Sequence, residues 1–228
     1  MVQINPCTVR VKFKKIGRLQ FVSHLDLVRT MMKVIVRARL PLRFSEGFNP
    51  KPRISFAAPL STGVQSVCEL MDIKLNERVD ENEVVARLNE SLTDELCAIE
   101  AYYPDTKFTE LGYLSYDIEL ELLNATEALA EKIEHTLKNP LPIMKKGKSG
   151  IREVDISPMI KEAKCQLDCG KIKLYCVLSS SPSSFLSPEL MIKALREHLG
   201  ILDEKNLADE GYTVMRTQAY FEDMSPFR

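Results

Sequence analysis

The stretch TVRVKFKKIGRLQFVSHLDLVRTMMKVIVR, residues 8–37, changes the spacing of its apolar residues halfway along and so decides how the fold begins. Apolar and basic residues alternate from Thr8 to Lys14, which is the period of a strand with one face in solvent. From Ser23 the apolar residues recur at helical spacing, in a stripe made of Leu25, Val28, Met32 and Ile35. A strand followed directly by a helix predicts an α+β protein, and Pro41 ends the helix.

The same alternation of elements continues toward the end of the chain. Strands are expected at 53–59 and 68–75, a helix at 81–92 and a strand at 96–103, which gives the β-α-β-β-α-β order of a ferredoxin-like domain. The order then recurs, with expected elements at 113–123, 126–137, 153–156, 164–178, 187–199 and 212–221. We therefore predict two tandem ferredoxin-like (βαββαβ) domains with antiparallel sheets, a basic one at 1–106 and an acidic one at 107–228. Periodicity leaves open a single α+β domain with a long mixed sheet.

Composition excludes several classes of protein. Hydrophobic residues make up 45% of the chain and charged residues 28%, as in globular proteins with a buried core. Charges interrupt the apolar runs well before about 18 residues, and the N-terminus lacks the pattern of a signal peptide, so we expect a cytoplasmic protein without a membrane span. The six cysteines are not at the spacing of a zinc site, so no metal and no cofactor are expected.

Charge is distributed unevenly along the chain. Residues 1–53 contain twelve Lys and Arg against two acidic residues, a net charge of +10, whereas the whole chain carries −1. On the expected helix, Arg29, Lys33 and Arg37 repeat every four residues and form a basic stripe. Such asymmetry predicts a cationic surface for a polyanion, although basic residues that pair with the acidic remainder would produce the same composition.

The segment FVSHLD, residues 21–26, contains both a helix cap and a candidate functional residue. Ser23 and Asp26 match a capping box, in which the serine accepts a hydrogen bond from the Asp26 amide and the carboxylate reaches back to the amide of Ser23. Capping does not require His24. Among lysines and arginines, His24 could contact RNA, act as a general acid or base on a ribose hydroxyl, or serve a structural role.

The loop from Arg43 to Arg53 interleaves cations with aromatic residues and turn residues. Such loops bind single-stranded RNA by stacking bases on rings and pairing phosphates with cations, although Phe44 and Phe48 could instead hold the loop against the core. The residues predicted to bind RNA are Lys15, Arg18, His24, Arg29, Lys33, Arg37, Arg43, Phe48, Asn49, Lys51 and Arg53. No catalytic residue is assigned beyond the candidate His24.

Three segments carry a family resemblance: RLQFVSHLDLVRTMMKVIVRARLPLRFSEGFNPKPRISFAAPLSTGVQS, IREVDISPMI and VMRTQAYFED. With them the chain resembles the radical-SAM-associated domain family of unknown function, in its stand-alone form. The resemblance implies a radical-SAM partner and work on RNA. The chain has no CxxxCxxC motif, so it does not resemble the radical-SAM enzyme itself. Its expected architecture is more loosely similar to that of the CRISPR repeat-processing endoribonucleases.

These observations favour an RNA-binding accessory protein that presents tRNA or rRNA to a radical-SAM partner. Two alternatives remain: a metal-independent endoribonuclease that uses His24, and an adaptor that binds the radical-SAM enzyme without RNA. The sequence specifies neither the RNA nor an oligomeric state.

Overall fold

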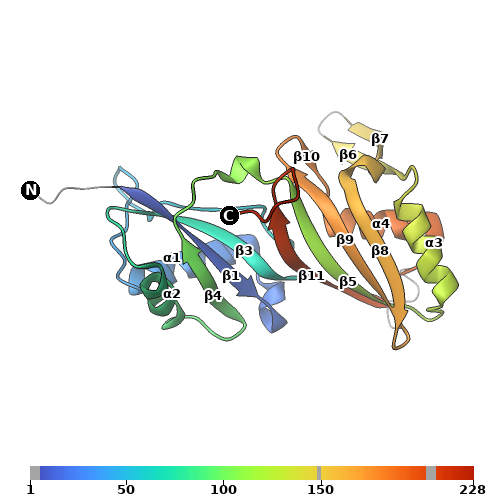
Figure 1. Cartoon of the computed structure of the whole chain (residues 1–228), viewed down its shortest axis with the longest axis horizontal. Coiled ribbons are helices and arrows are strands. Elements are labelled where there is room, and N and C mark those ends of the chain that lie inside the picture. Colours follow the sequence, from blue (N-terminus) through green and yellow to red (C-terminus); the bar gives the residue numbers. More distant parts are fainter. Residues whose placement is uncertain (1–5, 148–149, 204–208) are drawn as a thin grey trace, which may run out of the picture. The chain divides into compact units, whose positions relative to one another are not determined.

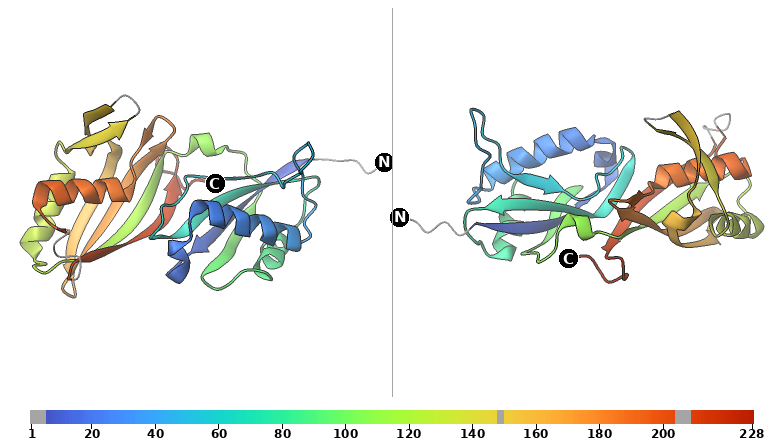
Figure 2. Two further views of the ribbon diagram at one scale, coloured as in Figure 1. Left: turned by 180° about the vertical axis from the view of Figure 1, so that it is seen from behind. Right: turned by 90° about the horizontal axis from the view of Figure 1, so that it is seen from above.

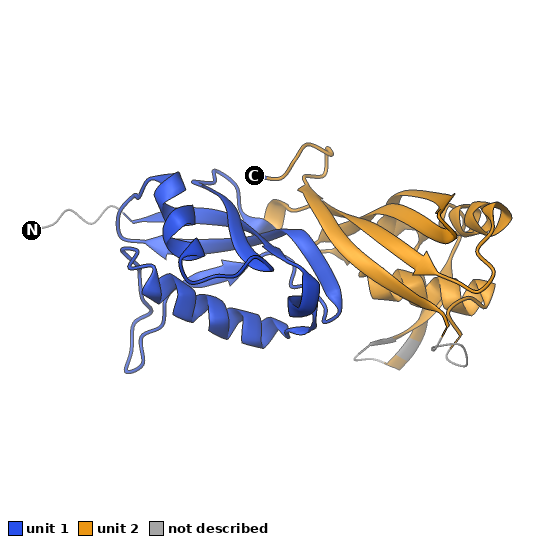
Figure 3. Cartoon of the chain, turned by 90° about the horizontal axis from the view of Figure 1, so that it is seen from below, with its two compact units in different colours: residues 1–108, 228 blue, residues 109–227 orange. Residues whose placement is uncertain are grey.

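A computed structural model describes residues 6–147, 150–203 and 209–228 of an α+β protein (Figure 1). The chain divides into two compact units, coloured separately in Figure 3. Unit 1 comprises residues 1–108 and Arg228, and unit 2 comprises residues 109–227. Within the described ranges, no helix has both the length and the apolar character needed to cross a membrane.

Unit 1 is built from four strands and two α-helices in its described part. In chain order they are β1 (Cys7–Lys15), α1 (His24–Arg37), β2 (Ile54–Phe56), β3 (Val64–Leu75), α2 (Glu81–Asn89) and β4 (Leu96–Tyr102). A short 3₁₀ helix, η1 (Gly17–Phe21), links β1 to α1. The strands lie in the order β4-β1-β3-β2, and each is antiparallel to its neighbours.

The core of unit 1 lies between the sheet and both helices. Val9, Val11 and Phe13 alternate along β1 and are fully buried, in one cluster with the apolar residues of α1 and α2. Both helices therefore cover the same face of the sheet, as Figure 2 shows. Burial of this kind contributes about 25 cal/mol per Å² of apolar surface, which is why the alternation of β1 specifies which face is inside.

The other face of β1 is not simply the solvent-exposed face that the alternation predicts. Arg10 is 0% exposed. Its guanidinium makes two bonds to the Asp72 carboxylate, at 2.7 and 3.0 Å, and donates to Thr106. The ring of Phe108 covers it at 4.3 Å. A strand residue that sequence alternation assigns to solvent is thus a buried structural cation.

Of the stripe predicted for helix α1, only Ile35 is buried, and the other buried residues are not members of that stripe. The buried residues are Leu27, Met31, Val34 and Ile35. Leu25, the first member of the predicted stripe, is 58% exposed. Both sets have helical spacing, so periodicity alone could not choose between them. The physical reason for the outcome is the sheet, because the stripe that begins at Leu27 is the one that meets the apolar face of β1 and β3.

The elements of unit 2 are β5 (Tyr113–Glu121), α3 (Glu127–Leu137), β6 (Pro142–Gly147), β7 (Gly150–Asp155), β8 (Ile160–Asp168), β9 (Lys171–Ser181), β10 (Ser184–Phe185), α4 (Pro188–Leu199) and β11 (Gly211–Tyr220). They have the same order as the elements of unit 1, with an extra hairpin (β6 and β7) and an extra short strand (β10). The order β11-β5-β9-β8 is antiparallel throughout, β10 also pairs with β9, and β6 and β7 pair only with each other within the described residues.

The prediction of one strand over 164–178 was wrong, because two strands occupy that region. Cys169 and Gly170 both have positive φ, at 48° and 79°, and form the two-residue turn between β8 and β9. Turns of this kind match the twist of the strands that they join. The predicted strand at 153–156 belongs instead to the β6–β7 hairpin, whose partner strand at 142–147 the sequence did not indicate.

Candidate nucleic-acid interface

The basic stripe of α1 faces solvent. Arg29, Lys33 and Arg37 follow one another at intervals of four residues on the side away from the core, and all three are exposed. Arg29 pairs with Asp26 at 3.1 Å, an exposed contact worth little. Lys33 and Arg37 make no ion pair with any described residue. The helix therefore presents cationic charge that the unit does not neutralise.

The start of α1 is capped, though not quite as a capping box requires. The Ser23 hydroxyl accepts from the Asp26 amide at 3.2 Å and donates to the Asp26 carboxylate at 2.7 Å, so the carboxylate bonds the hydroxyl and not the Ser23 amide. Hydrogen bonds from Ser23 and then Arg29 lower the pKa of Asp26. Both residues are accounted for by capping.

His24 lies beside an aromatic ring that packs against the core. Its ring meets that of Phe56 edge-on, with centroids 5.5 Å apart, and Phe56 in turn contacts Phe13 at 6.2 Å. Within the described residues, no hydrogen bond joins His24 to a carboxylate or to a second base. Its surroundings therefore assign it packing against an aromatic ring, and they assign it no acid–base partner.

The loop that was expected to bind RNA is an ordered hairpin with an exposed tip. Phe44 bridges Pro52, the Ser45 amide donates to the Lys51 carbonyl at 2.8 Å, and the Lys51 amide donates to the Ser45 hydroxyl at 3.0 Å. These pairs make the segment a ribbon, residues 43–53, which we call the 43–53 hairpin. It projects from unit 1 beside the end of α1 (Figures 2 and 3).

Phe48 is at the tip of this hairpin. It is as exposed as in an extended peptide, at 112%, and Asn49 and Lys51 beside it are exposed too. Of the two readings of the loop, anchoring by Phe48 is therefore wrong, since this ring contacts no core. Phe44, at 43% exposure, is only partly covered. An exposed aromatic ring without a packing partner can mark a binding surface. This ring lies at the tip of a hairpin that contains basic residues.

A shallow hollow lies between α1 and the base of the hairpin. Met32, Val36 and Pro52 line it with apolar surface, and Lys33 and Arg37 line it with their side chains, around a volume of about 320 Å³. The hollow brings two members of the basic stripe together with Pro52 of the hairpin, which lies fifteen or more positions further along the sequence. An apolar floor bordered by cations is the arrangement that binds bases together with their phosphates.

Two predicted residues do not line this hollow. Lys15 is 1% exposed, and its ammonium donates to the Gln20 carbonyl at 3.3 Å, so it faces the interior of unit 1. Arg18 is exposed on η1.

Arg43 and Arg53 meet at the base of the hairpin, where Lys74 of β3 joins them. Sequence reasoning missed Lys74, because nothing but the register of β2 with β3 brings it there.

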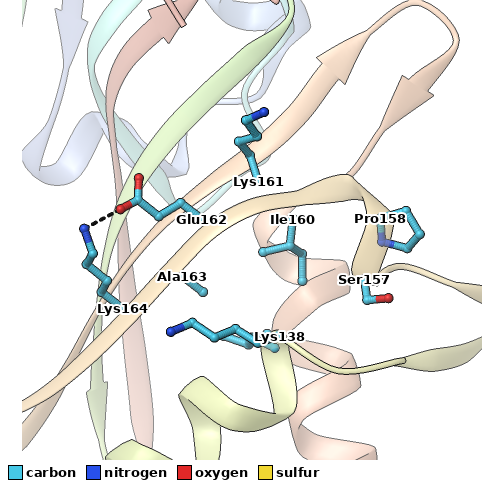
Figure 4. Close-up of a pocket in the computed structure, with 9 residues that line it drawn as sticks. Lys138, Ser157, Pro158, Ile160, Lys161, Glu162, Ala163 and Lys164 are labelled. Atoms are coloured by element: carbon cyan, nitrogen blue, oxygen red, sulfur yellow. Dashed lines mark ion pairs between the residues drawn. The ribbon is translucent and has the colours of Figure 1, made fainter.

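Unit 2 contains a larger hollow that also has several lysines (Figure 4). Its volume is about 520 Å³, between the end of α3 and the start of β8. Its cations are compensated internally: Lys164 pairs with Glu162, and Lys138 pairs with Glu134 at 2.5 Å. Lys161 points away from Lys138 and stacks over Tyr113 at 5.6 Å. This hollow therefore offers an anion far less uncompensated charge than unit 1 does.

No cluster of three or more metal-ligating side chains occurs in the part of the chain that the structure describes. Burial raises the pKa of the Cys165 thiol to about 12, and burial also raises that of Cys176. Both thiols are thus held in the protonated, unreactive form.

The fold and the surface together define an α+β protein of two units. Unit 1 exposes cations on α1 and on the 43–53 hairpin, which has Phe48 at its tip. The chain belongs to a family described as "Uncharacterized protein conserved in bacteria (DUF2344)", whose pattern matches residues 8–188. No curated protein matches it.

Among solved structures, the chain is similar to a chain in the "Crystal Structure of a Cbf5-Nop10-Gar1 Complex", with a TM-score of 0.50 and 10% identity. The similarity covers 95% of this chain and 49% of that one, so this chain spans about half the length of the structure it matches. At such low identity the likeness is one of fold.

Proposed function

We propose that unit 1 binds single-stranded RNA, with bases stacked on Phe48 and in the apolar hollow beside α1, and phosphates paired with the α1 stripe. The observation that carries the proposal is the fully exposed Phe48 at the tip of a cationic ribbon. Stacking on an aromatic ring contributes about 1–3 kcal/mol per base and tolerates any base, and this benefit needs the ring in solvent before binding. RNA in single strands has such bases available.

The α1 stripe supplies the second half of the proposal. Lys33 and Arg37 border the hollow whose floor is Met32, Val36 and Pro52, so a base in the hollow would have cations beside its phosphates. Arg29 continues the stripe toward the start of the helix. The exposed Arg18 and Lys51 extend the same charge to η1 and to the hairpin. Lys15 is not part of the proposed surface because it is buried.

For the fold we propose that each unit is a variant of the ferredoxin-like arrangement. The strand orders β4-β1-β3-β2 and β11-β5-β9-β8 support this, because in both units the two strands joined through a helix are separated by a third strand. The β6–β7 hairpin and β10 would be additions to that plan in unit 2.

The proposal also includes a protein partner. On the resemblance of the SHLDL and GFNPKP segments, the RNA would be presented to a radical-SAM protein, and the acidic unit 2 would contact that protein or serve as a structural companion. Co-purification of the two chains with and without nuclease separates a direct protein contact from one bridged by RNA. Loss of the pair on nuclease treatment would contradict direct docking.

RNA binding is tested by fluorescence anisotropy with a single-stranded oligomer over a range of salt. We expect log K to fall linearly with log salt. The change Arg29→Glu, Lys33→Glu and Arg37→Glu should abolish measurable binding, and a milder change of the same residues to Gln should reduce the slope by about 2, since each phosphate contact contributes roughly 0.7. Circular dichroism checks that the fold is intact.

A matched control reverses three exposed lysines on the helices of unit 2: Lys132→Glu, Lys138→Glu and Lys193→Glu. It changes the net charge of the chain by the same amount, and we expect it to weaken binding much less. Equal loss in both variants would show that only net charge matters, which contradicts a defined surface. Binding of an acidic protein but no RNA would favour the adaptor alternative, and a 2′,3′-cyclic phosphate product in EDTA that is lost in His24→Ala would favour the ribonuclease.

A further inference from the structure

Three cations are gathered at the base of the 43–53 hairpin by a closed set of backbone hydrogen bonds. The Arg43 amide donates to the Lys74 carbonyl at 2.9 Å, the Lys74 amide donates to the Arg53 carbonyl at 3.0 Å, and the Arg53 amide donates to the Arg43 carbonyl at 2.9 Å. Each residue is therefore bonded to the other two, and their positions are fixed by the main chain. We call these three residues the cation triad.

The three residues of the cation triad line one hollow. Its volume is about 190 Å³, and its remaining walls are Pro6, Cys7 and Thr8. The Lys74 ammonium bonds the Thr8 hydroxyl at 2.6 Å. Burial raises the pKa of the Cys7 thiol, so it adds no negative charge there. Among the described residues, no carboxylate forms an ion pair with any member of the triad.

Three like charges held side by side on a sheet are unfavourable by themselves. Opposed like charges on neighbouring strands destabilise a sheet, and here the register is imposed by β2, β3 and the hairpin base. The unit elsewhere avoids this cost, since buried Arg10 is matched by Asp72 and Arg87 by Glu83. Like Lys33 and Arg37, the triad lacks such a counterion in the described part of unit 1, and its three residues are in addition joined by main-chain hydrogen bonds.

The size and chemistry of the hollow specify the anion. Two guanidinium groups can each donate a pair of hydrogen bonds to the oxygens of a phosphate, and an ammonium adds a point charge. Pockets that bury a whole small-molecule ligand begin at about 300 Å³, so a hollow of about 190 Å³ takes a single small group and not a nucleotide. Carboxylates are smaller and carry less charge for three cations to neutralise.

We propose that Arg43, Arg53 and Lys74 form a binding site for one phosphate group of the RNA. This inference rests on the proposed function and adds a fixed anchor to it. Four residues of the hairpin lie between Arg43 and Phe48, so the two Cα atoms are at most about 18 Å apart. A phosphate held at the triad would therefore set which of the next few bases stacks on Phe48. The group is either a terminal monoester or an internal diester, and both have the chemistry that the site recognises.

The experiment uses the full chain, the double variant Arg53→Gln and Lys74→Gln, and three oligomers of one sequence that carry a 5′-phosphate, a 3′-phosphate or hydroxyls at both ends. We expect the double variant to bind at least about tenfold more weakly to the oligomer that the wild type prefers, because hydrogen bonds to charged groups are lost. A wild-type preference for one phosphorylated end, lost in the variant, identifies a terminal monoester. Equal wild-type affinities, all reduced in the variant, identify an internal diester.

The matched control is Lys145→Gln with Arg152→Gln. These exposed residues are also directly opposite each other, on β6 and β7, and their change removes the same charge. It should leave the affinities nearly unchanged. Unchanged affinities in the triad variant, or equal losses in variant and control, would overturn the phosphate site. If the triad variant binds normally while the α1 reversal abolishes binding, the site is disproved and the proposed function stands.

A second readout does not need RNA. Inorganic phosphate added to the wild type should shift the amide NMR signals of Arg43, Arg53 and Lys74 and raise the thermal midpoint, whereas sulfate-free chloride at equal ionic strength should not. The triad variant should lose both responses while keeping a midpoint at least as high as the wild type, because repulsion has been relieved. A response of the same size in the variant would overturn the site even if RNA fails to bind.

Discussion

The two units have similar strand orders and use their basic residues in opposite ways. In unit 2, lysines along the strands and helices are paired: Lys171 lies 2.6 Å from both Glu119 and Glu121, Lys173 pairs with Asp168, and Lys193 lies 3.5 Å from Glu197. In unit 1, the buried Arg10 pairs with Asp72 and the exposed Arg87 pairs with Glu83, while the exposed cations of α1 and the 43–53 hairpin are mostly left without carboxylates among the described residues. Unit 2 neutralises these basic residues with its own carboxylates, and unit 1 exposes the basic residues of α1 and the 43–53 hairpin to solvent.

This difference shows that the net charge of the whole chain does not describe how basic residues are used in each unit. A chain with a net charge of −1 would not be expected to bind a polyanion. Long-range repulsion from acidic residues is screened beyond about 8–10 Å at physiological salt, so a local surface of uncompensated cations can still bind one. The four predictions below test the contrast, from the largest expected effect to the smallest.

The largest effect should come from Arg10→Met. The change leaves the Asp72 carboxylate without its guanidinium partner, and breaking a buried ion pair from one side costs about 3–5 kcal/mol of unfolding free energy. The matched change in unit 2 is Lys171→Met, at an exposed pair, which should hardly move the urea midpoint. Urea denaturation followed by circular dichroism measures both. Equal midpoints for the two variants would contradict the distinction between structural and surface cations.

Glycine positions provide the second contrast. At Gly112 of unit 2 an added Cβ would lie 2.6 Å from the Glu222 nitrogen and 2.8 Å from the Phe221 carbonyl carbon, and backbone cannot easily yield. At Gly17 of unit 1, where φ is +60°, the three atoms nearest to an added Cβ would all belong to the flexible side chain of Glu95. We expect Gly112→Ala to lower stability by about 1–3 kcal/mol. Gly17→Ala should cost about 1–2 kcal/mol, mainly through its left-handed backbone. Thermal denaturation that ranks them in reverse would contradict this reasoning.

The third contrast concerns exposed aromatic rings. Phe48→Ala should weaken binding of single-stranded RNA by about 1–3 kcal/mol, with no change in unfolding free energy, because the ring packs against nothing. Phe185 on β10 of unit 2 is also exposed, at 46%, and Phe185→Ala is the control. Anisotropy titrations at one salt concentration compare them. If both variants bind as the wild type does, stacking at the hairpin tip is excluded.

The smallest expected effect is a change in thermal stability at low pH. The lowered pKa of Asp26 means that its carboxylate stabilises the folded chain above its ordinary pKa, and that this contribution disappears as the pH falls through the lowered value. The thermal midpoints of the wild type and Asp26→Asn should therefore converge as the pH falls from above the ordinary pKa of an aspartate through the lowered value. In unit 2 the pKa of Asp155 is lowered by the amides of Ser157 and Leu141.

Salt distinguishes these two carboxylates. The Asp26 contribution includes the exposed cation of Arg29, so about 1 M salt should reduce it, whereas the backbone bonds to Asp155 should resist salt. The measurement is the difference in midpoint between Asp155→Asn and the wild type, repeated in high salt. A midpoint difference that salt reduces equally at both positions would contradict the assignment of an ion pair to one and amide bonds to the other.

Local features of the sequence predicted helices and strands. Contacts between residues far apart in the sequence determine which residues lie at the candidate site. The change of period at Ser23 located α1, and Pro188 with Gly200 bounded α4, because caps and breakers act within a few residues. The turn at Cys169-Gly170 was missed, since cysteine seldom adopts a positive φ. The inner stripe of α1 could not be chosen from periodicity.

The site shows the same limit. Arg43 and Arg53 were recognised as cations of one loop, but Lys74 joins them through strand register, and Lys15 leaves the surface through burial. In the sequence, Phe48 was compatible with an anchor or with a ligand-binding ring, and only its full exposure excludes the anchor. Charge counts over a segment identify a basic region, but which of its members face solvent depends on packing against residues far away in the chain.

The hydrogen bonds that close the base of the hairpin also reduce the entropy that binding must remove. Ordering a free backbone costs about 1–2 kcal/mol per residue, so a structureless loop of eleven residues would forfeit much of what stacking and charge could contribute. Here the bonds among Arg43, Arg53 and Lys74, and the pairs at Phe44–Pro52 and Ser45–Lys51, fix all but the five residues from Glu46 to Pro50. A strand of nucleic acid that meets Phe48 would have only those five residues left to immobilise.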